Sequence, residues 1–294
     1  MKRLGNVVCI RATALLLAAL LAGCAATPLD NAALESETFE SHVENGQRHW
    51  NAGEYERATD AYQQALALQD RADIRKALGL LALSMSRFSQ ARAYLEPLVR
   101  DNPEDLNLRE NYAITLLKQQ DIKQAEAQFL AIHTLSPDRP ATLNYLGVIS
   151  DLQGDYAAAG DYYQKALSLQ PNNAIFNNNY GYSRLMLGDF IAAEHWFRQA
   201  LEQNPDQAER ITNNLAIAYA RQGQYEKAIT LLSATGDEPS VLNNIGYVAL
   251  LNGDYRSAIA YLERAIELSP SYYARAAANL ELARKSLDKS ESDS

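Results

Sequence analysis

The segment 140-PATLNYLGVISDLQGDYAAAGDYYQKALSLQPNN-173 contains the pattern that decides the fold. The next 34 residues, AIFNNNYGYSRLMLGDFIAAEHWFRQALEQNPDQ, repeat this pattern in phase. Matching glycines, alanines, aromatic residues and prolines stand at equal positions in the two segments: Gly147 and Gly181, Gly154 and Gly188, Tyr156 and Phe190, Ala159 and Ala193, Tyr163 and Phe197, Ala166 and Ala200, and Pro171 and Pro205. A period in the range of roughly 20–50 residues predicts an array of stacked units.

Each unit has the pattern of a helix, a turn and a second helix. Gly154 provides the turn, where a positive φ is accessible without strain, and Pro171 ends the second helix because it lacks a backbone N–H. The small Gly147 lets the two helices of a hairpin approach closely, and Tyr163 is expected to fill the space between hairpins. One hairpin cannot bury its apolar face alone, so neighbouring hairpins must stack.

This spacing resembles the tetratricopeptide repeat, although Leu143 and Asn177 stand where that pattern often has tryptophan. The resemblance implies an all-α solenoid, a right-handed superhelix of helical hairpins. In phase with the template, seven hairpins cover residues 39–272. A capping helix follows at residues 273–288, with Ala277, Leu280 and Ala283 on its buried face, and residues 289–294 are expected to be a disordered polar tail.

Three hairpins depart from the template. Pro97 is expected to bend or shorten the second helix of the second hairpin. In the third hairpin, Gln120 replaces the turn glycine. The sixth hairpin, at residues 209–238, is four residues short of the period and breaks at residues 233–238. This break is either a hinge that opens a groove or a tolerated deletion.

The first 24 residues have the layout of a secretory signal: basic residues are followed by a short apolar run. Leu21-Ala22-Gly23-Cys24 resembles the bacterial lipoprotein box. That resemblance implies that residues 1–23 are removed and that Cys24 becomes lipid-modified, whereas the alternative is an ordinary signal peptide with an incidental cysteine. Ala25 after the cysteine implies the periplasmic face of the outer membrane, and the lipidated Cys24 begins a flexible tether at residues 24–38.

The net charge of the chain limits the classes of partner that it can bind. The chain carries 27 basic and 36 acidic residues, a net charge of −9. An acidic protein is a poor ligand for nucleic-acid phosphates, so we expect no nucleic-acid partner. Only two cysteines are present, Cys9 and Cys24, which excludes a disulfide framework.

Asparagines recur on the first helix of the third to seventh hairpins, at repeat positions that line the concave surface of a tetratricopeptide array. Asparagine is a mediocre helix former, so its repetition needs a reason. One side-chain amide donates and accepts at once and therefore matches a peptide backbone, but the same amides could instead bond to the neighbouring hairpin. The candidate partner-binding residues are Asn111, Tyr145, Asn179, Asn214 and Asn244, with Tyr182 and Tyr247 beside them. Leu185, Met186, Leu250 and Leu251 form either a binding patch or packing between repeats.

The sequence lacks the phosphate-binding, nucleophile-elbow and metalloprotease motifs, and its four histidines are scattered. We therefore expect no enzymatic activity, cofactor or metal. A remote alternative is a peptidoglycan hydrolase, for which Asp151 and Glu110 would be the candidate carboxylates.

The sequence thus indicates a lipid-anchored periplasmic scaffold that binds proteins. Among bacterial lipoproteins with such repeats, the chain resembles the tight-adherence (Flp) pilus assembly group. The segments that carry this resemblance are AERITNNLAIAYARQGQYEKAI, the broken sixth hairpin and SVLNNIGYVALLNGDYRSAIAYLERAIELSP. The alternatives are a type IV pilus secretin pilotin and a general adaptor for envelope biogenesis enzymes.

Overall fold

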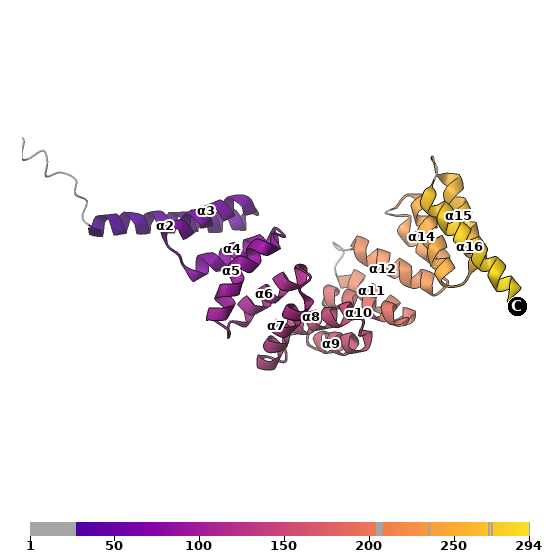
Figure 1. Cartoon of the computed structure of the whole chain (residues 1–294), viewed down its shortest axis with the longest axis horizontal. Helices are drawn as coiled ribbons and strands as arrows, with labels where there is room; N and C mark the ends of the chain where they lie inside the picture. Colours follow the sequence, from indigo (N-terminus) through magenta and orange to yellow (C-terminus); the bar gives the residue numbers. More distant parts are fainter. Residues whose placement is uncertain (1–27, 204–207, 235, 270, 272, 294) are drawn as a thin grey trace, which may run out of the picture. The chain divides into compact units, whose positions relative to one another are not determined.

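The computed structural model describes residues 28–203, 208–234, 236–269, 271 and 273–293, with side chains from residue 38 onward except at 208. The signal segment, Cys24 and the start of the expected tether lie outside this range. Every regular element in the described range is an α-helix, as expected for an all-α solenoid (Figure 1). In the same range, no helix is long and apolar enough to cross a bilayer.

The chain divides into two compact units between Asp121 and Ile122. The helices of the first unit are α2 (Pro28–Asn51), α3 (Tyr55–Leu68), α4 (Ala72–Ser84), α5 (Phe88–Asp101) and α6 (Leu106–Lys118). Those of the second are α7 (Ile122–Leu135), α8 (Pro140–Leu152), α9 (Tyr156–Leu169), α10 (Ala174–Leu187), α11 (Phe190–Gln203), α12 (Ala208–Arg221), α13 (Tyr225–Leu232), α14 (Glu238–Leu251), α15 (Tyr255–Leu268) and α16 (Ala274–Ser292).

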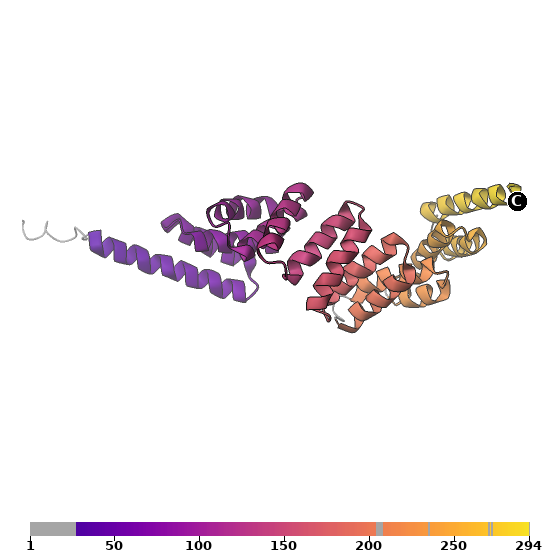
Figure 2. The same ribbon diagram turned by 90° about the horizontal axis from the view of Figure 1, so that it is seen from below.

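Consecutive helices within each unit pair as antiparallel hairpins, and these hairpins stack on one another (Figure 2). The α8–α9, α10–α11 and α14–α15 pairs are the regular ones, and α16 packs on α15 as a cap. The third expected hairpin is divided, because α6 belongs to the first unit and α7 to the second.

Close contact within a hairpin depends on glycine in the first helix. A Cβ atom on Gly147 would lie 2.7 Å from the Tyr163 ring, and one on Gly181 would lie 2.8 Å from the Phe197 ring. Both rings are fully buried. Tyr163 packs against Gly147 of its own hairpin and, as expected, also lies between hairpins, since the centroid of its ring is 6.0 Å from that of the Tyr180 ring of α10.

The turns also follow the sequence pattern. Gly154 has a φ of 82° in the turn between α8 and α9, with open space around it. Ser86 and Gln120 adopt the same left-handed conformation without being glycine, at φ angles of 58° and 64°. Helix starts are capped where a suitable side chain is present; for example, Asp105 accepts hydrogen bonds from the backbone N–H groups of Asn107 and Leu108.

Several boundaries differ from the sequence-based expectation. Pro97 lies inside α5 without shortening it, since α5 and α9 have the same length of 14 residues. Helix α2 already begins at Pro28, within the expected tether, and α16 continues to Ser292, through most of the expected tail. The buried face of α16 contains Ala276 rather than Ala277. The shortened second helix of the sixth hairpin is confirmed, because α13 has only 8 residues.

Candidate functional site

Large apolar side chains are exposed along the first helices of the second unit. They stand at the ninth and thirteenth positions of the repeat, and residues four apart lie on the same face of a helix. The helices concerned are α8, α10, α12 and α14, each of which contacts the next. We call this set the apolar stripe: Leu152, Tyr182, Met186, Ile217, Tyr247 and Leu251. Their exposed fractions range from 41% for Ile217 to 57% for Leu152. Contiguous exposed apolar surface of this kind marks interaction sites.

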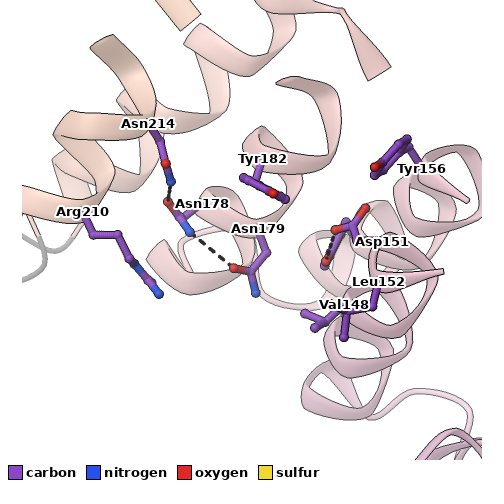
Figure 3. Close-up of a pocket in the computed structure, with 10 residues that line it drawn as sticks. Val148, Asp151, Leu152, Tyr156, Asn178, Asn179, Tyr182, Arg210 and Asn214 are labelled. Atoms are coloured by element: carbon purple, nitrogen blue, oxygen red, sulfur yellow. Dashed lines mark hydrogen bonds between the residues drawn. The ribbon is translucent and has the colours of Figure 1, made fainter. Parts of the chain in front are cut away.

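Asparagine side chains form a hydrogen-bonded ladder beside this stripe. Asn214 Nδ2 donates to Asn178 Oδ1 at 3.1 Å, and Asn178 Nδ2 donates to Asn179 Oδ1 at 3.3 Å. Asn179 Nδ2 in turn donates to Asn144 Oδ1 at 3.0 Å. Figure 3 shows Asn214, Asn178 and Asn179 following one another across neighbouring helices. These amides therefore join α8, α10 and α12 to each other.

A second run of the ladder joins the last helices. Asn279 Nδ2 donates to Asn243 Oδ1 at 3.1 Å, and Asn243 Nδ2 donates to Asn244 Oδ1 at 3.3 Å. In the described part of the chain, no asparagine pair connects the two runs across α12 and α14. Asn213 and Asn244 are both exposed at this interruption.

The remaining predicted binding residues have varied surroundings. Asn111 belongs to the first unit, where its Nδ2 donates to the Asn107 carbonyl of its own helix at 2.8 Å. The half-buried Tyr145 stacks on Phe129, with ring centroids 4.9 Å apart. Tyr182 and Tyr247 are exposed on the apolar stripe. The structure thus brings Asn179, Asn214 and Tyr182 together in one pocket, with Asn244 and Tyr247 in another and Asn111 apart.

The first pocket lies over α8, α10 and α12, with a volume of about 350 Å³ (Figure 3). Asp151 is the single carboxylate among its described lining residues, and it accepts a hydrogen bond from Tyr163 Oη at 2.7 Å. Burial raises the pKa of Asp151, against the opposing effects of the Tyr163 hydrogen bond and the Arg184 charge. Burial likewise raises the pKa of Tyr163 above its ordinary value.

This pocket does not contain the acid pair that glycoside hydrolysis requires. Glu110, the other candidate carboxylate, lies in the first unit. Across the described residues, no group of three or more histidine, cysteine or acidic side chains is arranged to hold a metal ion.

The second pocket is a groove between α12 and α14, with a volume of about 510 Å³. Its described lining residues are mostly apolar, and none of them is charged: Asn213, Ile217, Ala220, Leu232, Asn244, Ile245, Tyr247, Val248 and Leu251. We call it the α12–α14 groove.

Sequence reasoning identified part of this surface. It grouped Leu250 with Leu251, but Leu250 is buried in the core and only Leu251 is exposed. In the fifth hairpin, Leu185 is half-buried and Met186 is exposed. Sequence reasoning missed Leu152 and Ile217. The signal for both was available, because they occupy the same repeat positions as Met186 and Tyr182.

Family models described as tetratricopeptide repeat match residues 76–140, 140–173, 162–195, 184–239 and 239–272. The solved structure of a tetratricopeptide repeat protein from Parabacteroides merdae ATCC 43184 is 13% identical. That match covers 84% of this chain and 99% of the other, with a TM-score of 0.60. No curated protein matches this chain significantly.

Two further solved structures are similar in fold. One is the APC/C hetero-tetramer Cut9-Hcn1, with 19% identity, a TM-score of 0.57 and coverage of 92% of this chain and 51% of the other. The other is MamA from Desulfovibrio magneticus RS-1, with 17% identity, a TM-score of 0.51 and coverage of 58% of this chain and 97% of the other. At these identities the similarity concerns the arrangement of helices.

Proposed function

The chain belongs to the tetratricopeptide-repeat family, and from this we propose that it is a lipid-anchored periplasmic scaffold whose apolar stripe binds another protein. The repeat fold is suited to protein–protein interaction because its hairpins present an extended series of helix faces. In this proposal the protein performs no catalysis and holds partners of the cell envelope in place.

The observation that carries the proposal is the composition of the exposed face in the second unit. Interface cores are enriched in tyrosine and methionine and depleted of charge. The apolar stripe contains two tyrosines, a methionine and three aliphatic residues, and none of its members is charged. In the whole chain, by comparison, 21% of residues are charged.

The proposed location rests on residues 1–25. The apolar run and Leu21-Ala22-Gly23-Cys24 support lipidation at Cys24, and Ala25 supports sorting to the outer membrane. Acyl chains anchor firmly, because each buried CH₂ contributes about 0.8 kcal/mol. The body of the protein would then face the periplasm.

For the machine that is served, we favour the tight-adherence (Flp) pilus. The sequence resemblance in the sixth and seventh hairpins supports this choice. A type IV pilus secretin pilotin and a general adaptor for envelope biogenesis enzymes are the alternatives, and both use the same anchored scaffold.

Photo-crosslinking in cells tests the proposal. A crosslinking amino acid at Tyr182, on the apolar stripe, should capture a protein of the envelope. Ile191 is the matched control because it is an apolar residue, 75% exposed, on the second helix of the same hairpin.

The identity of the captured protein separates the alternatives. Pilus secretion components would support the pilus assignment, whereas cell-wall enzymes or outer-membrane assembly proteins would support the general adaptor. Equal capture from Ile191 and Tyr182, or capture of cytoplasmic proteins alone, would contradict the proposal.

A further inference from the structure

We propose that the α12–α14 groove binds an extended, uncharged peptide segment of the partner, with one large apolar side chain inserted between Ile217, Tyr247 and Leu251. This inference rests on the proposed function, because it assigns a specific ligand to one part of the protein-binding surface. It differs from uniform binding along the asparagine ladder.

The groove lies at the one irregular hairpin of the second unit. Helix α13 has 8 residues, whereas α9, α11 and α15 have 14 each. Its last residue, Leu232, is part of the groove lining. The asparagine ladder is interrupted at the same place. The short hairpin therefore coincides with both the groove and the interruption of the ladder.

At the interruption, the asparagine amides that line the groove differ from the amides at equivalent positions in the rest of the array. Asn178, Asn179 and Asn144 are linked to one another, and the first and last are buried. Asn213 and Asn244, by contrast, are exposed and line the groove, and Asn244 uses only its Oδ1 in the ladder, where it accepts from Asn243 Nδ2. Each amide offers donors and an acceptor, which are the groups that a peptide backbone requires.

The amides favour an extended ligand over a helical one. The backbone N–H and C=O groups of a helix already bond to each other, except at its ends. An extended segment has unpaired backbone groups that Asn213 and Asn244 can satisfy. In an extended segment alternate side chains point the same way, so one apolar side chain enters the groove while its neighbours point away.

The absence of charge in the lining determines the chemistry of the ligand. A charged side chain placed against these nine residues would lose hydration without gaining an ionic partner, which is costly. An apolar side chain instead covers the exposed surfaces of Tyr247 and Leu251. The groove therefore selects an uncharged segment with an aromatic or aliphatic anchor.

The test uses the full-length mature chain and a random dodecapeptide library displayed on phage. Peptides selected by the wild type are synthesised with a fluorescent label, and their affinities are measured by fluorescence anisotropy. We expect uncharged peptides with one aromatic or large aliphatic residue to be enriched.

Two matched variants locate the binding site. Leu251→Asp places a charge in the groove, and Ile191→Asp places one on α11, outside the apolar stripe; Leu251 is 55% exposed and Ile191 is 75% exposed in the wild type. Leu251→Asp should weaken peptide binding by about tenfold or more, equivalent to ~1.4 kcal/mol. Ile191→Asp should leave it within about twofold, or ~0.4 kcal/mol. Circular dichroism checks that both variants keep their helix content.

Backbone recognition has its own test. The double variant Asn213→Ala and Asn244→Ala, and N-methylation of the peptide beside its anchor residue, should each weaken binding. A peptide that becomes helical when bound, and that tolerates both changes, would overturn the extended geometry.

The remaining outcomes also decide the matter. Failure to select any uncharged peptide, or equal weakening by Leu251→Asp and Ile191→Asp, would overturn the inference. In either case crosslinking from Tyr182 to an envelope protein would still support the scaffold, so the two proposals can fail separately.

Discussion

At the scale of single residues, each regular hairpin depends on a glycine that lies beneath a large side chain of the second helix. Gly147 lies under Tyr163, Gly181 under Phe197 and Gly246 under Leu262. The buried ring or branched chain fills the space that a side chain on the first helix would otherwise need. These pairs fix the distance between the two helices of a hairpin.

Gly181→Leu should therefore destabilise the second unit. A Cβ at this position would lie 2.8 Å from the Phe197 ring, so the hairpin must open or the ring must move. Overpacking of this kind costs typically about 1–3 kcal/mol, measurable by urea unfolding. Tyr182→Leu, a change at the exposed neighbour, is the control. Equal midpoints for Gly181→Leu and the wild type would contradict the close-contact role.

Ser86→Gly should stabilise the first unit. Ser86 has a φ of 58°, a left-handed conformation that costs a non-glycine residue roughly 1–2 kcal/mol. Glycine removes this strain but adds freedom to the unfolded chain, so we expect a net gain of up to about 1 kcal/mol. The same substitution at Ser84, the last residue of α4, should instead lower the melting temperature. A lower melting temperature for Ser86→Gly as well would refute the strain argument.

Asp151 gives a pH-dependent prediction. Burial raises its pKa in the folded protein, so the folded state holds the proton more tightly than the unfolded state does. Its contribution to stability is thus most favourable below the ordinary carboxyl pKa and falls as pH rises through the raised value. Asp151→Asn removes this titration while an amide oxygen remains to accept from Tyr163. The unfolding free energy of the variant minus that of the wild type should increase from pH 4 to pH 7. A constant or decreasing difference would show that the carboxylate is not held at a raised pKa.

At the scale of elements, the asparagine ladder shows why a single sequence pattern supported two interpretations. Asn178, Asn179 and Asn214 bond to each other across α10 and α12, and Asn179 bonds to Asn144 on α8, which is packing between hairpins. Asn213 and Asn244 occupy equivalent helix positions but remain exposed. The difference coincides with the short sixth hairpin, where α13 has only 8 residues.

Asn178→Ala should destabilise the array more than Asn244→Ala. Asn178 is buried and bonds to both Asn179 and Asn214, so its loss removes two hydrogen bonds between neighbouring groups. We expect a loss of about 1–3 kcal/mol for Asn178→Ala and less than about 1 kcal/mol for Asn244→Ala. Thermal unfolding followed by circular dichroism measures both. Similar costs at the two positions would contradict the division of the ladder.

The helices and turns were predictable because repetition supplied several copies of each signal. Turn glycines, glycines opposite a large side chain and terminating prolines recur in most hairpins. Side-chain surroundings were less predictable: at position 12 of the repeat, Leu250 is buried but Leu185 is only half-buried. The sequence also gave no sign that α5 would continue through Pro97.

At the scale of the whole molecule, the residues of the predicted array, 39–272, are divided between two compact units. The division falls in the third hairpin, next to Gln120, which takes a positive φ in place of the usual turn glycine. The apolar stripe and both ladder runs belong entirely to the second unit.

If the protein is a lipid-anchored scaffold, as proposed, the thiol sulfur of Cys24 determines where the protein is located. Cys24→Ser removes the thiol that would carry the lipid. The variant should therefore move from the membrane fraction to the soluble periplasmic fraction, as measured by immunoblotting after carbonate extraction. Cys9→Ser is the matched control and should leave the wild-type distribution unchanged, because Cys9 lies in the segment expected to be removed. A Cys24→Ser protein that stays in carbonate-washed membranes would refute the lipid anchor, while binding of selected peptides to the same purified variant would still report on the α12–α14 groove.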